Sequence, residues 1–178
     1  MRTLLVLTVS LLASCGPPWA VLVQSGPPSA VAGAQSVSYA ADFSQVIIDG
    51  NPFGAEPPGE QQSLSEAFGN MDQRFLEAFS GRMPVPVVPA NAPPGPGEVR
   101  MSPVFVEIVR GARGPIGGAS QLVTRFRWTI GGQVTDEVEV YCSVSPSLTR
   151  MSVGGRLNSC AQRAGKQAAQ FFERANRQ

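Results

Sequence analysis

The sequence predicts a two-layer α+β domain, in which a mainly antiparallel sheet of four or five strands carries two helices on one face. Two segments, 63–80 and 157–175, have apolar residues at steps of three and four, the spacing of one helical face. Between them lie three segments rich in β-branched and aromatic residues, joined by glycine-rich connections, which favours an antiparallel meander. This order of elements is that of a sheet with its helices on one side.

Composition supports a folded domain and excludes some partners. Of the 178 residues, 43% are hydrophobic and 15% charged, so a core can form and wholesale disorder is not expected. Without Arg2, the only charge in residues 1–14, the 14 basic residues fall to 13 and equal the 13 acidic ones. A neutral chain has no long-range field to gather nucleic acid, and we expect no nucleic-acid partner.

The N-terminus reads as a secretory signal. Met1-Arg2-Thr3 is followed by an apolar run over 4–12, with small residues at Ala13 and Ser14. The run is too short to span a bilayer as a stable helix.

The end of this leader, Leu12-Ala13-Ser14-Cys15, resembles the lipobox of bacterial lipoproteins. The alternative is a plain secretory signal in which a cysteine falls by chance at this position. The resemblance implies cleavage before Cys15, which then carries a diacylglyceryl thioether and an N-acyl chain, and two or more acyl chains hold a protein stably. Gly16 follows the cysteine, and by the sorting rule of enteric bacteria this favours the outer membrane, with the domain facing the periplasm.

The resemblance implies three parts: a signal peptide over 1–14, the lipidated cysteine and a tether over 15–35, and a single domain over 36–178. The tether is rich in Pro, Gly, Ala and Ser. Within it, residues 19–23 are expected to form a short first strand or to lie near the lipid interface.

The two helices have recognisable starts. Ser63 and Glu66 form a capping-box pattern, and Gly81 is a suitable stop. Ser159 to Gln162 resembles a second capping box, and the face of that helix is made mostly of small residues, which lets it approach a sheet closely.

The strands are expected over 37–43 and 46–48, and then over 99–110, 120–130 and 134–144. The segment 82–97 contains six prolines, which no helix and no central strand tolerates, so we expect an irregular or polyproline-like connector.

The register of the last two strands follows from their apolar faces. Leu122, Phe126, Trp128 and Ile130 share one face, and Val134, Val138, Val140, Cys142 and Val144 share a face on the next strand. The two faces coincide only if paired positions sum to an even number. A three-residue loop over 131–133 satisfies this and pairs Ile130 with Val134, although glycine is usual at the last loop position, which is Gln133.

The same register has a consequence for the opposite face of the sheet. It places Arg125 opposite Glu139 and Arg127 opposite Glu137, and each pair contributes roughly 0.2–1 kcal/mol. We therefore expect a solvated strand face there, with Asp136 beside these glutamates, rather than a catalytic carboxylate group.

Cys142 and Cys160 are the remaining cysteines once Cys15 is assigned to lipid. In an oxidising envelope they are expected to form a structural disulfide, which would contribute about 3 kcal/mol. Two buried free thiols and a redox pair are the alternatives, and the long spacing disfavours the redox pair.

Catalytic and cofactor motifs are not found. With no histidine, a Ser-His-Asp triad and the commonest metal ligand are missing. The glycine-rich stretch 110–118 lacks the lysine and following helix of a phosphate loop and reads as a hairpin loop. We therefore expect no enzyme, no cofactor and no metal.

The function expected from these observations is that of a non-enzymatic envelope lipoprotein. It would be an adaptor or accessory subunit of an assembly or transport system, anchored through Cys15 and binding another envelope protein. The alternative is a protein that binds lipid or a small apolar ligand in a cavity between helix and sheet, lined by Phe68, Phe75 and Trp128.

Overall fold

The computed structural model describes residues 18–177 except 91–94, 113–117, 148 and 151. Along these residues the elements are β1 (Ala20–Val23), β2 (Val37–Tyr39), β3 (Ile47–Ile48), β4 (Asn51–Pro52), the 3-10 turn η1 (Phe53–Ala55), α1 (Pro58–Ser80), β5 (Val87–Pro89), β6 (Val99–Val109), β7 (Ser120–Ile130), β8 (Gln133–Val144) and α2 (Val153–Ala175). The class is α+β, as expected. Within the described residues, neither helix is long and apolar enough to cross a membrane.

The sheet is larger and more mixed than expected. Its order is β1-β8-β7-β6-β2-β5, with β3 joined to β6 and β4 joined to β3, which makes eight strands among the described residues. The long strands β6, β7 and β8 form the expected antiparallel meander. The prediction of four or five mainly antiparallel strands was wrong because β2 and β3 run parallel to β6, and β5 runs parallel to β2. β2 and β3 lie within the strands expected over 37–43 and 46–48, whereas β4 and β5, with two and three residues, are too short for an alternating pattern to reveal them.

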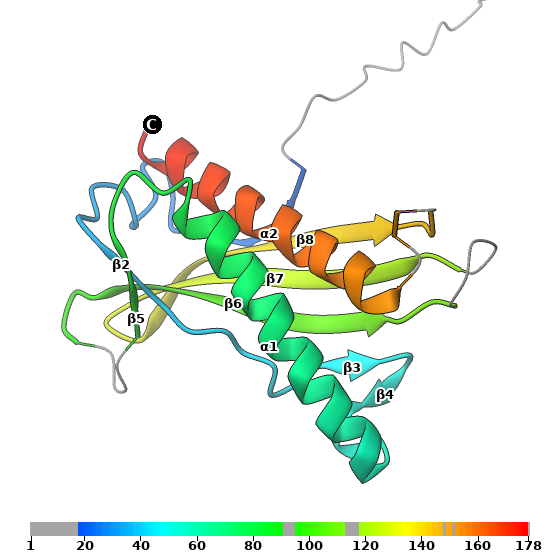
Figure 1. Cartoon of the computed structure of the whole chain (residues 1–178). Helices are drawn as coiled ribbons and strands as arrows, with labels where there is room; N and C mark the ends of the chain where they lie inside the picture. Colours follow the sequence, from blue (N-terminus) through cyan, green and yellow to red (C-terminus); the bar gives the residue numbers. More distant parts are fainter. Residues whose placement is uncertain (1–17, 91–94, 113–117, 148, 151, 178) are drawn as a thin grey trace, which may run out of the picture.

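Both helices lie on the same face of the sheet (Figure 1). Phe75 of α1 contacts Phe126 of β7 edge-to-face, and Phe172 of α2 stacks on Trp128, two residues further along β7. The helices also contact each other at Gly165, where a Cβ atom would meet the Phe75 carbonyl of α1. A glycine is therefore what allows the two backbones to approach so closely.

The helix starts differ from the expected capping boxes. α1 begins five residues earlier than Ser63, with Pro57 as its N-cap, and α2 begins at Val153, where the Ser152 side chain accepts a hydrogen bond from the Gly155 amide. Ser63 and Ser159 instead donate to the carbonyl four residues back in their own helices. Serine in a helix interior commonly makes this bond, so a capping-box pattern alone does not fix a helix start.

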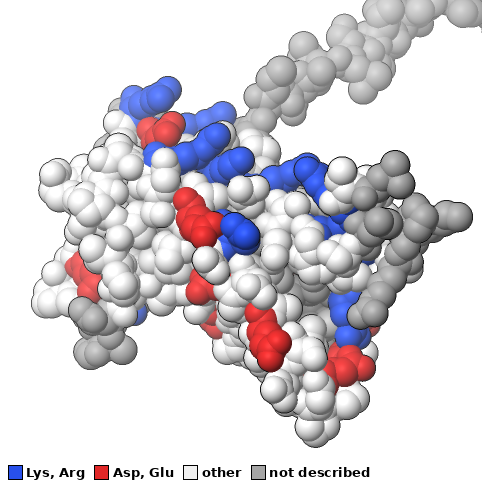
Figure 2. All heavy atoms as spheres, in the orientation of Figure 1, with Lys and Arg blue, Asp and Glu red and all other residues white. Residues whose placement is uncertain are grey.

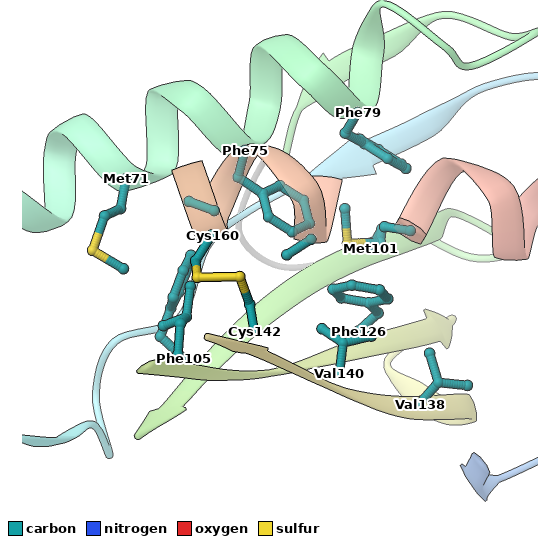
Figure 3. Packing of buried hydrophobic residues seen from close by; sticks show 14 of the residues in the cluster. Met71, Phe75, Phe79, Met101, Phe105, Phe126, Val138, Val140, Cys142 and Cys160 are labelled. Atoms are coloured by element: carbon teal, nitrogen blue, oxygen red, sulfur yellow. A yellow bond between two sulfur atoms is a disulfide. The ribbon is translucent and has the colours of Figure 1, made fainter. Parts of the chain in front are cut away.

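The hydrophobic core lies between the helices and the sheet (Figure 3). The expected stripe on α1 supplies four of its members, and β6, β7, β8 and α2 supply most of the others. The buried α1 residues are Phe68, Met71, Phe75 and Phe79. The helical periodicity of this segment was therefore read correctly even though its start was not.

The hairpin between β7 and β8 is tighter than expected. Ile130 pairs with Gln133, not with Val134, so the turn is the two residues Gly131 and Gly132. Their φ angles of 56° and 85° are the left-handed values that a two-residue type I′ turn requires at both positions. An irregularity between Trp128 and Thr129 then restores the even register along the rest of the hairpin.

Two proline- and glycine-rich segments join the sheet at its edges. The connector 82–97 contains β5, which is confined to an edge as its prolines require. In the expected tether, β1 pairs with β8 at the other edge, and Val31 is fully buried in the core. From Ala20 onward the chain therefore belongs to the folded domain.

Candidate functional site

The expected lipidation site, Cys15, lies outside the described residues. The first described residue is Pro18, three positions later, and β1 begins two residues after that. If Cys15 is the anchor, very little chain separates it from the folded domain.

Cys142 of β8 and Cys160 of α2 are brought together (Figure 3). Their Sγ atoms lie 2.15 Å apart and their Cα atoms 5.5 Å apart, which is disulfide geometry. Cys142 is 8% exposed and Cys160 is fully buried. A pair so placed joins the helix layer to the sheet layer and offers little access to an exchanging thiol.

The face of the sheet opposite the helices carries the expected charge pairs along β7 and β8. Arg125 lies opposite Glu139 with an N–O distance of 2.8 Å, and Arg127 lies opposite Glu137 at 3.1 Å. Tyr141, on β8 next to this row, is 59% exposed. This polar sheet face is therefore open to solvent, with a large aromatic side chain at its margin.

Asp136 does not belong to that solvated face, so the expectation for this residue was wrong. It is fully buried beside the irregular position of the β7–β8 hairpin. Its carboxylate accepts hydrogen bonds from the hydroxyls of Ser25 (3.0 Å) and Ser29 (2.9 Å) and from the Ser25 amide (3.2 Å). Asp136 thus fastens the segment after β1 to the sheet.

An arginine at the end of β6 gathers three carboxylates. Arg110 forms ion pairs with Asp49, with Glu60 at 2.8 Å and with Glu56 at 3.5 Å. The hydrogen bond from Arg110 lowers the pKa of Glu60, and the bonds to Asp49 and Glu60 raise the pKa of Arg110 itself. The cluster ties the β3–β4 turn and the start of α1 to β6.

The hollow beside this cluster has a volume of about 520 Å³ and is also lined by Leu64 and Val153. Because the guanidinium already neutralises part of the carboxylate charge, the cluster is a poor cation site. Across the part of the chain that the structure describes, no group of three His, Cys, Asp or Glu side chains is arranged to hold a metal ion.

A second polar cluster lies where β2 meets β6. Glu98 accepts hydrogen bonds from the Ser38 hydroxyl, from the Gly95 amide (2.8 Å) and from Arg100 (3.0 Å). These bonds, the one from Ser38 most of all, lower the pKa of Glu98 from 4.5 to about 2. A carboxylate held by three donors is an ionised structural anchor rather than a proton donor.

Tyr39, at the end of β2, also has a shifted pKa. Burial raises the pKa of its phenol, and the hydrogen bond that it donates to Asp72 of α1 raises it further. The hydroxyl remains protonated at any physiological pH and serves to fix α1 over β2.

The surface of α2 carries a basic stripe that the near-zero net charge concealed. Its members are Arg163, Lys166 and Arg174 of α2, with Gln170 between them, and Arg177, which follows two residues after the helix ends. Their sequence spacing could have revealed it, since the three members within α2 fall on one side of a helix. The guanidinium carbon of Arg174 lies 5.0 Å from the centre of the Trp19 ring, so the stripe reaches the residue that precedes β1.

The three aromatic residues expected around a ligand cavity are packed into the core. Phe75 and Trp128 are fully buried, and Phe68, which is 7% exposed, stacks on Phe43 with ring centres 4.6 Å apart. Trp128 contacts three phenylalanine rings at 5.6 to 6.1 Å. The space between helix and sheet at these residues is filled by neighbouring rings.

No protein-family model matches this chain, and no curated protein does. Among solved structures, the PelC dodecamer from Paraburkholderia phytofirmans in space group P6 is 13% identical, with a TM-score of 0.46, over 83% of this chain and 97% of that one. A point variant of the same protein in space group C2 is 14% identical with a TM-score of 0.44, over 85% of this chain and 95% of that one. An uncharacterized protein is 13% identical with a TM-score of 0.41, over 85% and 93%. At this level of similarity no property of these proteins is transferred to this chain.

Proposed function

We propose that this chain is an envelope lipoprotein, anchored through Cys15 to the periplasmic leaflet of the outer membrane, that acts as a non-enzymatic adaptor or accessory subunit of an assembly or transport system. The observation that carries the proposal is the lipobox-like Leu12-Ala13-Ser14-Cys15 at the end of a signal-like leader. Three acyl chains on Cys15 would make the attachment stable.

On this proposal the anchor allows a small domain to act through binding alone. A partner in the same membrane meets the tethered domain at a high effective concentration, so a weak interface suffices. The polar sheet face around Arg125, Arg127 and Tyr141 offers such an interface, because both helices occupy the other side of the sheet. Interfaces favour exposed tyrosine and arginine of this kind.

The packing of the core weighs against the alternative of a bound apolar ligand. Such a ligand needs an apolar cavity of several hundred Å³. The rings of Phe68, Phe75 and Trp128, which would have lined it, contact other aromatic rings instead. Binding there would require α1 to separate from the sheet.

The test is a crosslinked affinity purification from the detergent-solubilised envelope, comparing the wild type with Cys15→Ala. The mass of the N-terminal peptide is measured in the same preparations. We expect acylated Cys15 in the wild type and an envelope protein that is recovered with the wild type and lost with the variant. An unmodified Cys15 would refute the anchor, and recovery of the protein with only lipid or a small molecule would refute the adaptor role.

A further inference from the structure

The edge strand β1 exposes apolar side chains to solvent. It is the terminal strand of the sheet order, and Val21, Leu22 and Val23 are 50%, 46% and 40% exposed. Three consecutive exposed aliphatic residues on an unprotected edge are a feature that soluble proteins usually avoid. Some surface is therefore expected to cover β1.

The basic stripe of α2 reaches β1 at its C-terminal end, where Arg174 and Val21 line the same hollow. At 100° per residue, Arg163, Lys166 and Arg174 fall within an arc of about 80° on the helix, and Arg177 follows two residues after its end. Glu173, paired with Arg177 at 3.7 Å, is the acidic neighbour. Figure 2 shows basic side chains gathered along the upper margin of the molecule, where Figure 1 places α2.

The other helix has the opposite character. α1 carries Glu60, Glu66, Asp72 and Glu77 against a single basic residue, Arg74. Figure 2 shows acidic side chains over the helix that Figure 1 labels α1. Although the chain is nearly neutral, its charges are segregated between the two helices.

The apolar edge and the basic stripe form one continuous surface. Trp19, which precedes β1, packs edge-to-face on Phe171 of α2 with ring centres 6.1 Å apart. Arg174 of the stripe lies over the same indole ring. An aromatic residue between an apolar patch and basic side chains is the arrangement typical of a membrane interface.

The position of Cys15 identifies what covers this surface. Three residues lie between Cys15 and Trp19, so the four residue steps that join them span at most about 14 Å even when fully extended. A lipidated Cys15 sits at the headgroup level of its bilayer. The surface nearest to it is the one that bears Trp19, β1 and the end of α2.

We propose that β1 and the basic stripe of α2 form a docking surface for the anionic phospholipid headgroups of the membrane that holds Cys15. This rests on the proposed lipid anchor and adds an orientation to it. The aliphatic side chains of β1 enter the interfacial region, and Arg163, Lys166 and Arg177 face phosphate groups. The acidic helix α1 and the polar sheet face then remain accessible to a partner.

The experiment places an environment-sensitive fluorophore on the lipidated full chain in vesicles. Gln170→Cys puts it in the middle of the stripe, and Ser65→Cys puts it on α1. The labelling is selective because Cys15 is acylated and Cys142 and Cys160 are paired. Quenching by a headgroup-labelled lipid is measured in pure phosphatidylcholine and in mixtures with phosphatidylglycerol. We expect stronger quenching at position 170 than at 65, and an increase with phosphatidylglycerol.

The charge requirement is tested with two double variants. R163E/K166E is expected to reduce the docked population at least about tenfold, since each basic residue near an anionic surface contributes on the order of 1 kcal/mol. R74E/R82E, which reverses as many charges on and just after α1, should leave quenching at position 170 unchanged.

Equal quenching at positions 170 and 65, or quenching insensitive to phosphatidylglycerol and to R163E/K166E, would overturn the docking surface. The mass of the Cys15 peptide in the same samples reports the anchor separately. A lipidated protein without oriented docking therefore refutes only this inference, whereas an unlipidated one refutes the proposed function.

Discussion

At the scale of single residues, Arg156 of α2 carries a fully buried positive charge. Burying a charge costs free energy unless its donors are all paired. The Arg156 guanidinium donates to the Ser120 hydroxyl (2.9 Å), the Ala112 carbonyl (2.8 Å) and the Arg150 carbonyl (3.4 Å). The Ser120 hydroxyl in turn donates to the carbonyl of Arg110. One cation therefore joins the start of α2 to the ends of β6 and β7.

Replacing this arginine should be costly. Arg156→Met removes the donors and leaves buried oxygen atoms without partners, and we expect the free energy of unfolding to fall by about 2–4 kcal/mol. Urea denaturation measures it. Arg163→Met, an exposed change on the same helix, should change the free energy of unfolding by no more than about 0.5 kcal/mol. Equal effects of the two variants would contradict the structural role assigned to Arg156.

The lowered pKa of Glu98 predicts that the free energy of unfolding decreases in acid. Its folded-state pKa of about 2 lies below the ordinary value of 4.5, so its stabilisation is fully present above pH 4.5 and is lost as the pH falls toward 2. Glu98→Gln should flatten the dependence of the unfolding free energy on pH within that window. Ser38→Ala should flatten it in part, because the Ser38 hydroxyl is the main cause of the lowered pKa. Parallel pH profiles for all three proteins would contradict this.

The roles of these residues could not be predicted from the sequence. Asp136 finds its serine partners more than 100 positions away, and Arg156 finds Ser120 36 positions away. The sequence indicated instead a solvated Asp136 and gave no reason to bury Arg156. In contrast, the pairs of Arg125 and Arg127 with their glutamates were predictable, since they follow from an alternating pattern on adjacent strands.

At the scale of elements, Gly165 controls how the two helices pack. A Cβ atom there would collide with the Phe75 carbonyl and lie 3.2 Å from the Ala78 Cβ. Gly165→Ala should therefore destabilise the protein by roughly 1–3 kcal/mol, although alanine is the better helix former. Thermal or urea unfolding measures the change.

The matched control lies on the other helix. Gly69 of α1 is exposed, and a Cβ atom there meets nothing within 4 Å. Gly69→Ala should stabilise the protein by about 0.5–1 kcal/mol. If both variants gained stability, close helix contact at Gly165 would be excluded.

Hydrophobic periodicity predicted the long helices and strands correctly. Capping-box and loop-length patterns predicted the helix starts and the β7–β8 turn at the wrong residues. The apolar stripe of α1 and the three meander strands were evident, because each repeats its pattern over many residues. The helices were expected from Ser63 and from about Leu157 but begin at Pro58 and Val153. The hydroxyls of Ser63 and Ser159, assigned to capping boxes, bond within the helices instead.

The glycine pair at 131–132 is typical of the two-residue turn that the structure has. The three-residue loop was predicted because one register was assumed along the whole hairpin, without the irregularity after Trp128.

At the scale of the whole molecule, the contact between Cys142 and Cys160 joins the sheet to the helix layer. A disulfide there should raise the free energy of unfolding by about 3 kcal/mol. We expect the intact mass to show the loss of two hydrogens, and dithiothreitol to lower the urea midpoint of the wild type. The double variant Cys142→Ala/Cys160→Ala should be less stable and indifferent to dithiothreitol. A wild-type mass with both thiols free would refute the bond.

The topology of the whole sheet was the least predictable feature. The strands β2 and β3 were expected from their β-branched and aromatic residues, but nothing in the sequence indicated that they run parallel to β6, and β5 lies in a proline-rich segment with no strand pattern. Likewise, the exposed edge of β1 appears only once the chain is folded, whereas the charge asymmetry between α1 and α2 can be read from the two helical segments taken separately. Net charge averages that asymmetry away.

The place of β1 also determines how the domain responds to mechanical load. If the proposed anchor at Cys15 holds, a pull transmitted through it would reach β1 first, and this strand is short and bonded along one side only, to β8. It would peel away one hydrogen bond at a time, resisted next by the bonds of Ser25 and Ser29 to Asp136. Releasing residues 20–36 would lengthen the chain between Cys15 and the folded part of the domain by at most about 60 Å. The β6–β8 meander would remain folded, so in an anchored protein the edge strand would yield to force before the rest of the domain.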